Sequence, residues 1–276
     1  MLPTIKIGDH DISRLIVGHN PFSGNSHMNE ALDWEMRDYF TTARIKETLF
    51  RCQELGINTM IGRGDMHLLR LIHEFKQDGG KLNWICMTGG EFGHFDGHIN
   101  QIMQYKPTAI YHHGSVTDGL FKAGQVDELK RRLDLIKSYG IPAGLGTHMP
   151  EVLEYAEAHN WGADFYMASV YNLSLESNRV SSAITGKANE GERFEEEDIP
   201  VMYDMIREVD KPCLAFKILG AGRRCASQET VRSAFLEAFA NIKDTDAVVV
   251  GMYPKNEDQP ALDVRYTEEA ILAAKK

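Results

Sequence analysis

Eight short apolar or β-rich runs recur along the 276-residue chain, and stretches with helical periodicity separate most of them. The expected strands are Leu15–Gly18, Thr59–Gly62, Trp84–Thr88, Ala109–His113, Ala143–Thr147, Phe165–Val170, Cys213–Ile218 and Ala247–Gly251. Such alternation is typical of repeated βα units around a parallel sheet. Eight units in a chain of this length predict an α/β protein with a single (β/α)8 TIM barrel, which typically needs about 250 residues.

The remaining segments fit one domain over residues 1–276. Helices are expected at Ala43–Leu55, Met66–Phe75, Val126–Tyr139, Glu151–His159, Ile199–Val209, Gln228–Asn241 and Thr267–Lys275. Residues 1–13 read as an N-terminal hairpin with a Gly-Asp turn. A doubly wound open sheet is the competing architecture, but no GxGxxG motif follows the first strand.

Two connections are longer than ordinary loops. Asn20–Thr42 follows the first strand and Leu173–Asp198 follows the sixth. Both leave the carboxyl ends of strands, where barrels build their active sites, so they are candidates for lids. The alternative for the second loop is a mobile, solvated segment.

Composition narrows the range of partners. The net charge is −10 with acidic residues spread along the chain, which disfavours nucleic acid as a partner. The apolar runs are far shorter than the roughly 20 residues that cross a bilayer, and no signal peptide is visible, so a cytoplasmic protein without membrane association is expected. The four cysteines form no CxxC pair and are expected to be reduced core thiols. The oligomeric state is left open, and a homo-oligomer is compatible with the sequence.

Four short segments carry a resemblance to a known family: Ser13–Gly24, Leu55–Thr59, Lys217–Gly222 and Thr245–Met252. They resemble segments of the aldo-keto reductases, a family of TIM barrels that reduce carbonyls with NADPH. The resemblance implies a catalytic Asp, Tyr, Lys and His at strand ends.

Three of those four positions do not carry the family's residue. The Asp position falls near Ile61, the Tyr position near Met66 or His67, and the Lys position at Thr88 or Gly89. The His position alone has a counterpart, at His112 or His113. The chain therefore resembles a divergent member of this lineage with different chemistry.

Polar side chains gather where the expected strands end. They are His19, Asn20, Arg63, Asp65, His112, His113, His148, Tyr171, Asn172, Lys217 and Tyr253. Because the carboxyl ends of the strands meet at one mouth, these residues predict a binding site for a small-molecule substrate. His113, His148, Asp65 and Lys217 are the candidate acid–base groups, and the others are candidate substrate contacts. Side chains alternate along a strand, so His112 and His113 cannot both face the barrel interior, and His113 is favoured.

Three further interpretations concern the same mouth. His19, His113 and His148 could hold a divalent metal ion, with Asp65 as a fourth ligand or a base; alternatively, these rings only donate or accept hydrogen bonds. Desolvation of Lys217 would favour a neutral amine, suited to a base or a Schiff base, unless a carboxylate pairs with it. Gly220, Gly222, Arg223 and Arg224 fit an anion site with unpaired amides and two guanidiniums, or a glycine turn with surface arginines.

Three functions follow from these residues. The favoured one is a non-redox lyase, isomerase or hydrolase that acts on a small polar carbonyl or sugar-like substrate, with a divalent metal as an option. The first alternative is an NAD(P)-dependent oxidoreductase in which Arg223, Arg224 and Lys255 face the phosphates. The second is a barrel that binds a ligand without catalysis.

Overall fold

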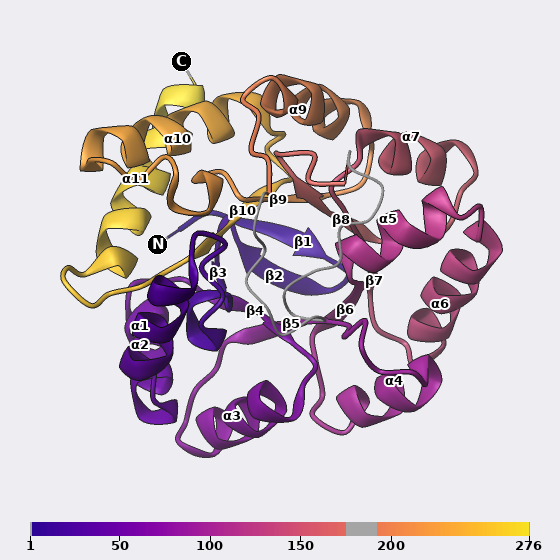
Figure 1. The fold of residues 1–276 in the computed structure, drawn as a ribbon, viewed down its shortest axis with the longest axis horizontal. Coiled ribbons are helices and arrows are strands. Elements are labelled where there is room, and N and C mark those ends of the chain that lie inside the picture. Colours follow the sequence, from indigo (N-terminus) through magenta and orange to yellow (C-terminus); the bar gives the residue numbers. More distant parts are fainter. Residues whose placement is uncertain (1, 175–191, 276) are drawn as a thin grey trace.

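Eight parallel strands close into a barrel in the computed structural model, which describes residues 2–174 and 192–275. The strands are β3 (Leu15–Gly18), β4 (Thr59–Arg63), β5 (Asn83–Met87), β6 (Ala109–His112), β7 (Ala143–Thr147), β8 (Phe165–Ser169), β9 (Cys213–Phe216) and β10 (Ala247–Gly251). They follow one another in order around the barrel, and β10 pairs with β3 to close it. The predicted TIM barrel is confirmed, with a ring of helices around it (Figure 1).

The N-terminal hairpin closes one end of the barrel. Strands β1 (Thr4–Ile7) and β2 (His10–Ser13) pair antiparallel, and they lie across the barrel opening in Figure 1. Ile5, Ile7 and Ile12 are buried in the same apolar cluster as the inward side chains of the barrel. The hairpin therefore seals the amino ends of the strands and leaves the carboxyl ends for the site.

Alternation along the strands divides the side chains between two apolar layers. Ile61 and Phe165 belong to the cluster inside the barrel, whereas Leu145 and Tyr166 pack between the barrel and its helices. The barrel interior is filled rather than hollow: a Cβ on Gly144 would lie 2.4 Å from the Phe165 ring. This packing makes the interior a rigid base for the mouth.

The ring of helices differs from the expected one at four helices. The helices are α1 (Glu30–Tyr39), α2 (Thr42–Glu54), α3 (Met66–Gln77), α4 (Phe95–Met103), α5 (Gly114–Lys122), α6 (Val126–Ser138), α7 (Pro150–Ala158), α9 (Asp198–Glu208), α10 (Gln228–Asn241) and α11 (Gln259–Ala274). The sequence did not predict α1, α4 or α5, and α11 begins eight residues before Thr267. Glycine weakens the helical signal of α4 and α5, which contain Gly97, Gly114 and Gly119. Asp258 caps α11 and a proline occupies its first turn, which together are a start signal that the apolar periodicity does not reveal.

Helix α5 begins directly after β6 and packs against β7. A Cβ on Gly146 would lie 2.8 Å from the carbonyl oxygen of His112 and 3.1 Å from the backbone nitrogen of Gly114. A Cβ on Gly114 would in turn lie 3.2 Å from Cε1 of His148. The two glycines thus allow the helix to approach the strand closely enough to contact the residues at its end.

The side chain of Arg14 stabilises the seam between β3 and β10, where the barrel closes. Val248 pairs with Leu15, and Gly251 pairs with Gly18. The buried side chain of Arg14 donates hydrogen bonds to the carbonyl oxygens of Asp246 and Lys243, each at 2.8 Å. These bonds tie the start of β3 to the segment that leads into β10.

The structure also bears on two other expectations, one about the cysteines and one about the long connections. Cys52, Cys86 and Cys213 are buried free thiols, but Cys225 is exposed, so the expectation of four core thiols was wrong for this one. Of the long connections, Asn20–Thr42 contains a short 3-10 helix at Pro21–Ser23 and α1, while residues 175–191 of Leu173–Asp198 lie outside the described residues. Within the described residues, no helix is both long enough and apolar enough to cross a membrane.

Candidate active site

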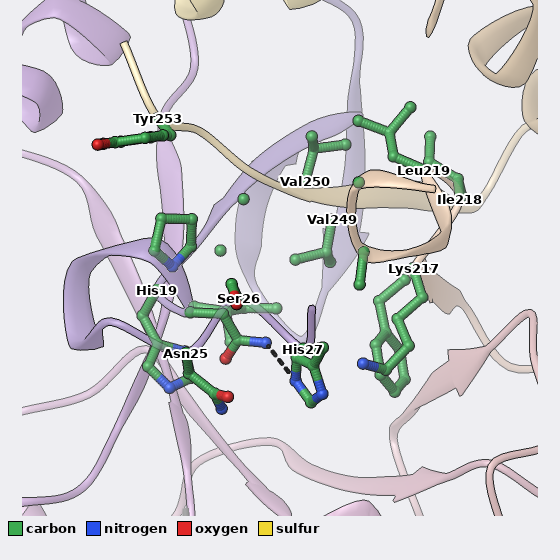
Figure 2. A pocket seen from close by; sticks show the side chains of 18 of the residues that line it. His19, Asn25, Ser26, His27, Lys217, Ile218, Leu219, Val249, Val250 and Tyr253 are labelled. Carbon is green, nitrogen blue, oxygen red and sulfur yellow. Dashed lines mark hydrogen bonds between the residues drawn. The ribbon is translucent and has the colours of Figure 1, made fainter. Parts of the chain in front are cut away.

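A cavity of about 490 Å³ opens at the carboxyl ends of the strands. Its floor consists of inward side chains of the barrel: Ile61, Met87, Tyr111, Met167, Phe216 and Val249. Polar residues from the connecting segments surround this floor, among them His19, His27, His113, His148 and Lys217. Figure 2 shows Lys217 and His27 extending into the cavity. The cavity therefore combines an apolar base with convergent polar groups, as small-molecule sites do.

His148 and Asp118 form a buried pair at this cavity. Asp118 lies on α5, and its carboxylate Oδ2 accepts a hydrogen bond from His148 Nδ1 at 2.8 Å. Because a carboxylate can only accept, Nδ1 carries the proton and Nε2 is the basic nitrogen of the ring. The Asp118 carboxylate also accepts from the hydroxyls of Thr147 and Ser174 and from the His148 backbone N–H. Four donors thus hold one carboxylate, which fixes the orientation of the imidazole.

Asp118 is the site residue that the sequence did not reveal. The residue follows β6 on a helix that was not expected, so nothing placed its side chain near the end of β7. A usable signal existed: His113 is followed at once by a short polar helix, Gly114-Ser-Val-Thr-Asp118. A helix that starts at a strand end without a loop carries its first turns across the barrel mouth.

Lys217 enters the cavity from an unusual backbone conformation. It follows β9 with a φ of 65°, in the left-handed region that non-glycine residues rarely adopt. Such strain persists only where the surrounding structure imposes it, and it occurs most often at functional sites. The ammonium nitrogen lies 5.5 Å from the centre of the Phe194 ring. Phe216, the residue before Lys217, contacts the ring of His148 edge to face, with ring centres 5.7 Å apart.

The segment after β3 supplies His19 and a second polar network. Burial lowers the pKa of His19 to about 4, against the opposing effect of the Asp65 charge, so the ring is neutral at pH 7. Asn20 donates its amide to His27 Nε2 at 3.3 Å, and His27 Nδ1 contacts Glu192 at 2.9 Å. This network joins the segment after β3 to the segment before α9 at the cavity.

The two adjacent histidines at the end of β6 lie on opposite sides of the barrel wall. His113 lines the cavity. His112 is buried among the helices, where it contacts Thr117 at 2.8 Å and Arg132 at 3.1 Å. The structure therefore corrects the prediction that His112 contacts the substrate, because alternation along the strand turns this ring outward.

Asp65 and Arg63 also differ from their expected places. Asp65 is the N-cap of α3 and accepts from the backbone N–H of Leu68 at 2.9 Å. Arg63 forms an ion pair with Glu91. Neither residue is among those that line the cavity. Asp65 acts on the site through its charge near His19, rather than as a base in contact with substrate.

The aromatic and amide candidates, Tyr253, Tyr171 and Asn172, also differ in whether they line the cavity. Tyr253 lines the cavity, and its hydroxyl donates to Glu35 at 2.8 Å; burial raises the pKa of this phenol. Tyr171 and Asn172 are not among the residues that line the cavity. Tyr171 packs edge to face on Phe194, and Asn172 accepts from the backbone N–H of Ser174 at 3.2 Å. Asn172 thus supports the serine that donates to Asp118.

The expected anion site is engaged in internal contacts. The backbone amides of Gly220, Gly222, Arg223 and Arg224 donate to carbonyl oxygens within residues 217–220. Arg224 pairs with Glu237, and the Arg223 guanidinium lies 3.8 Å from the centre of the Phe194 ring. The segment therefore fits the alternative interpretation, a glycine turn with surface arginines, because the donors that would hold an anion already have partners.

The candidate metal ligands do not come together. Within residues 2–174 and 192–275, no group of three or more His, Cys, Asp or Glu side chains has the geometry to hold a metal ion. His19, His113 and His148 all line the cavity but form no three-ligand cluster.

The buried histidines predict a loss of stability in acid. Burial lowers the pKa of His19 to about 4 and of His112 to about 3, from 6.5 in the unfolded chain. The unfolded state therefore binds more protons as pH falls from 6.5, and folding stability declines until the folded pKa is reached. For His112 the loss by pH 4.5 is on the order of 3 kcal/mol. Urea unfolding between pH 7 and 4.5 should show a smaller decline for His112→Gln than for the wild type; equal declines would contradict the assignment.

Comparisons with known proteins identify the fold. The sequence matches no family model and no curated protein. Among solved structures, it is similar to an aldo-keto reductase of Bacillus halodurans, with a TM-score of 0.59 and 11% identity over 100% of this chain and 96% of the other.

Two further structures belong to enzymes of different chemistry. A truncated 3-deoxy-D-arabino-heptulosonate 7-phosphate synthase of Thermotoga maritima has a TM-score of 0.55 and 16% identity over 99% and 91% of the two chains. The 3-hexulose-6-phosphate synthase of Salmonella typhimurium has a TM-score of 0.53 and 12% identity over 94% and 99%. These likenesses establish the shared barrel fold.

Proposed function

We propose that the protein is a non-redox enzyme that moves a proton next to the carbonyl of a small polar or sugar-like substrate, as a lyase or isomerase does. The observation that carries the proposal is the Asp118–His148 pair, in which a carboxylate binds Nδ1 of an imidazole that lines the cavity. A buried base that a carboxylate orients is the arrangement that general base catalysis requires.

The other cavity residues take complementary roles. His148 Nε2 accepts the proton from the carbon beside the carbonyl, and the electron pair moves onto the carbonyl oxygen. Lys217 and His113 line the same cavity and can donate hydrogen bonds to that oxygen. The proton of the neighbouring hydroxyl moves to the former carbonyl oxygen, and His148 returns its proton to the former carbonyl carbon, which completes the isomerisation of a hydroxyaldehyde to a hydroxyketone or the reverse. If Lys217 instead attacks the carbonyl as a neutral amine, the carbonyl oxygen leaves as water, and His148 removes the same proton while the electron pair moves onto the nitrogen of the Schiff base.

Deuterium exchange tests the proposal for any substrate of this class, whatever product the enzyme forms from it. The protein is incubated in D₂O with a panel of small hydroxyaldehydes and hydroxyketones, and ¹H NMR follows the protons beside the carbonyl. Catalysed exchange is expected for at least one compound, and exchange should disappear in His148→Gln. Borohydride reduction in the presence of the same compound then shows whether Lys217 forms a Schiff base, since Lys217→Met should abolish any trapped adduct. Absence of exchange across the panel would count against the function.

An NAD(P)-dependent oxidoreductase remains the alternative that the segment resemblance implies. The arginines on which it relied, Arg223 and Arg224, already contact Phe194 and Glu237. Fluorescence titration with NADH and NADPH on the same preparation separates the two functions. Saturable nucleotide binding together with absent exchange would favour the oxidoreductase.

A further inference from the structure

The cavity extends beyond the barrel mouth to a region between two helices. Lining residues of this region come from α10, α11 and the segments before them: Gly222, Cys225, Gln228, Val231, Glu257, Gln259, Leu262 and Asp263. We refer to these residues as the α10–α11 arm. The arm belongs to the same cavity as His148 and Lys217, and none of its residues takes part in the proposed reaction.

Asp263 is the exceptional residue of the arm. The side chain projects from α11, lines the cavity and is only 5% exposed. Among the residues that the structure describes, none donates a hydrogen bond to this carboxyl group or forms an ion pair with it. A buried polar group without a partner is costly, and a buried charge more so. Burial, with a smaller contribution from the Glu257 charge, raises the pKa of Asp263 well above its usual range.

The charge of the arm is one-sided. Glu257 and Asp263 are its acidic residues, and none of the lining residues defined above is basic. Nearby cations pair with other carboxylates: Arg224 with Glu237, Arg51 with Asp258, and Lys255 with Glu35. A phosphate in the arm would meet two carboxyl groups, whereas a cation would find an ion-pair partner.

We infer that the α10–α11 arm binds a protonated amine of the ligand through the Asp263 carboxylate. The ligand then spans the cavity, with its amine at Asp263 and its reacting carbonyl near His148. This inference extends the proposed function, because it names the second group of the substrate. The binding of the amine itself does not depend on turnover.

The test uses three probes of similar size: n-butylammonium, n-butanol and n-butyl phosphate. Binding is measured by saturation-transfer NMR at pH 8 and constant ionic strength, on the wild type, Asp263→Asn and Asp210→Asn. Asp210 is exposed and remote in the sequence, so its variant controls for the change in net charge. Butylammonium should bind the wild type and the Asp210 variant, and Asp263→Asn should weaken it about tenfold or more.

Stability and proton release distinguish a ligand contact from a structural role. Asp263→Asn should be at least as stable as the wild type, because it removes an unpartnered buried acid; if it fails to fold, Asp263→Ala takes its place. Amine binding should release a proton, seen as a binding enthalpy that varies with the buffer. Glu257, Cys52 and Cys225 are the other titratable groups that influence this carboxyl. Partial desolvation raises the pKa of Cys225 to about 11, and burial raises that of Cys52, so both thiols stay protonated at pH 8.

Two results would overturn the inference. Equal binding of butanol and butylammonium would show that the arm recognises only the alkyl chain. Preferential binding of butyl phosphate, or butylammonium binding unchanged in the Asp263 variants, would show that the carboxylate is not the contact. Each of these outcomes is independent of the deuterium-exchange result, so failure of the arm and failure of the proposed function are distinguishable.

Discussion

Asp118→Asn should lower kcat/KM for the exchange-active substrate by about 10²- to 10⁴-fold, the range over which general acid–base catalysis contributes. The amide of Asn keeps the size of the side chain but can donate to Nδ1. The imidazole would then carry its proton on Nε2, which faces the reaction without a lone pair to accept the substrate proton. His148→Gln should lower the rate by a similar factor, since the base itself is removed.

Asp118 does not touch the substrate, so its role as a positioning residue needs its own readout. Nitrogen chemical shifts of His148 should report a proton on Nδ1 in the wild type and on Nε2 in Asp118→Asn. Asp134→Asn is the matched control, because Asp134 is exposed on α6 and pairs with Lys130. A variant with normal tautomer and reduced stability would assign Asp118 to folding alone.

Gly146→Val should reduce stability by about 1–3 kcal/mol or more, the usual cost of forcing extra atoms into a packed site. The added side chain would press on the His112 carbonyl oxygen at the end of β6 and on the Gly114 nitrogen at the start of α5, and both are backbone atoms that cannot rotate away. Displacement of α5 would separate Asp118 from His148. The variant should therefore lose activity together with stability, as measured by urea unfolding and by the exchange assay at a temperature where it remains folded.

A glycine on the same helix provides the control. A Cβ on Gly119 would meet no atom within 4 Å, and its position is helical. Gly119→Ala should leave activity unchanged and raise stability by roughly 0.5–1 kcal/mol, because alanine restricts the unfolded chain. If Gly146→Val behaved like Gly119→Ala, the close approach of α5 to β7 would not be what positions the pair.

The barrel was predictable because its signal is periodic and repeated. Each strand is a short apolar run, and β3, β7 and β10 have the expected bounds. The histidines at the mouth could also be predicted from the sequence, since strand ends converge in any closed barrel. Alternation along the strand allowed only one of His112 and His113 to face the interior, and His113 was favoured because it lies nearest the mouth.

Side-chain partners, in contrast, could not be predicted from the sequence. Asp65 and Arg63 stand at a strand end like the others, but a helix cap and an ion pair with Glu91 engage them. The importance of Asp118 depends on a helix whose two glycines conceal it. Asp263 lies in the last helix, far along the sequence from His113 and His148, and its isolation appears only once the surrounding cations are seen paired elsewhere.

The seam between β3 and β10 has a consequence for how the chain folds. Leu15 pairs with Val248, so the barrel closes only when segments more than two hundred residues apart have met. Contacts between residues so far apart in the sequence form slowly, because the entropy of closing a long loop is lost before the contacts stabilise the chain. During synthesis, β3 and its hairpin leave the ribosome long before β10 exists. The edge of β3 that pairs with β10 therefore stays unpaired until β10 is made, and the Arg14 contacts to Asp246 and Lys243 form only when the barrel closes.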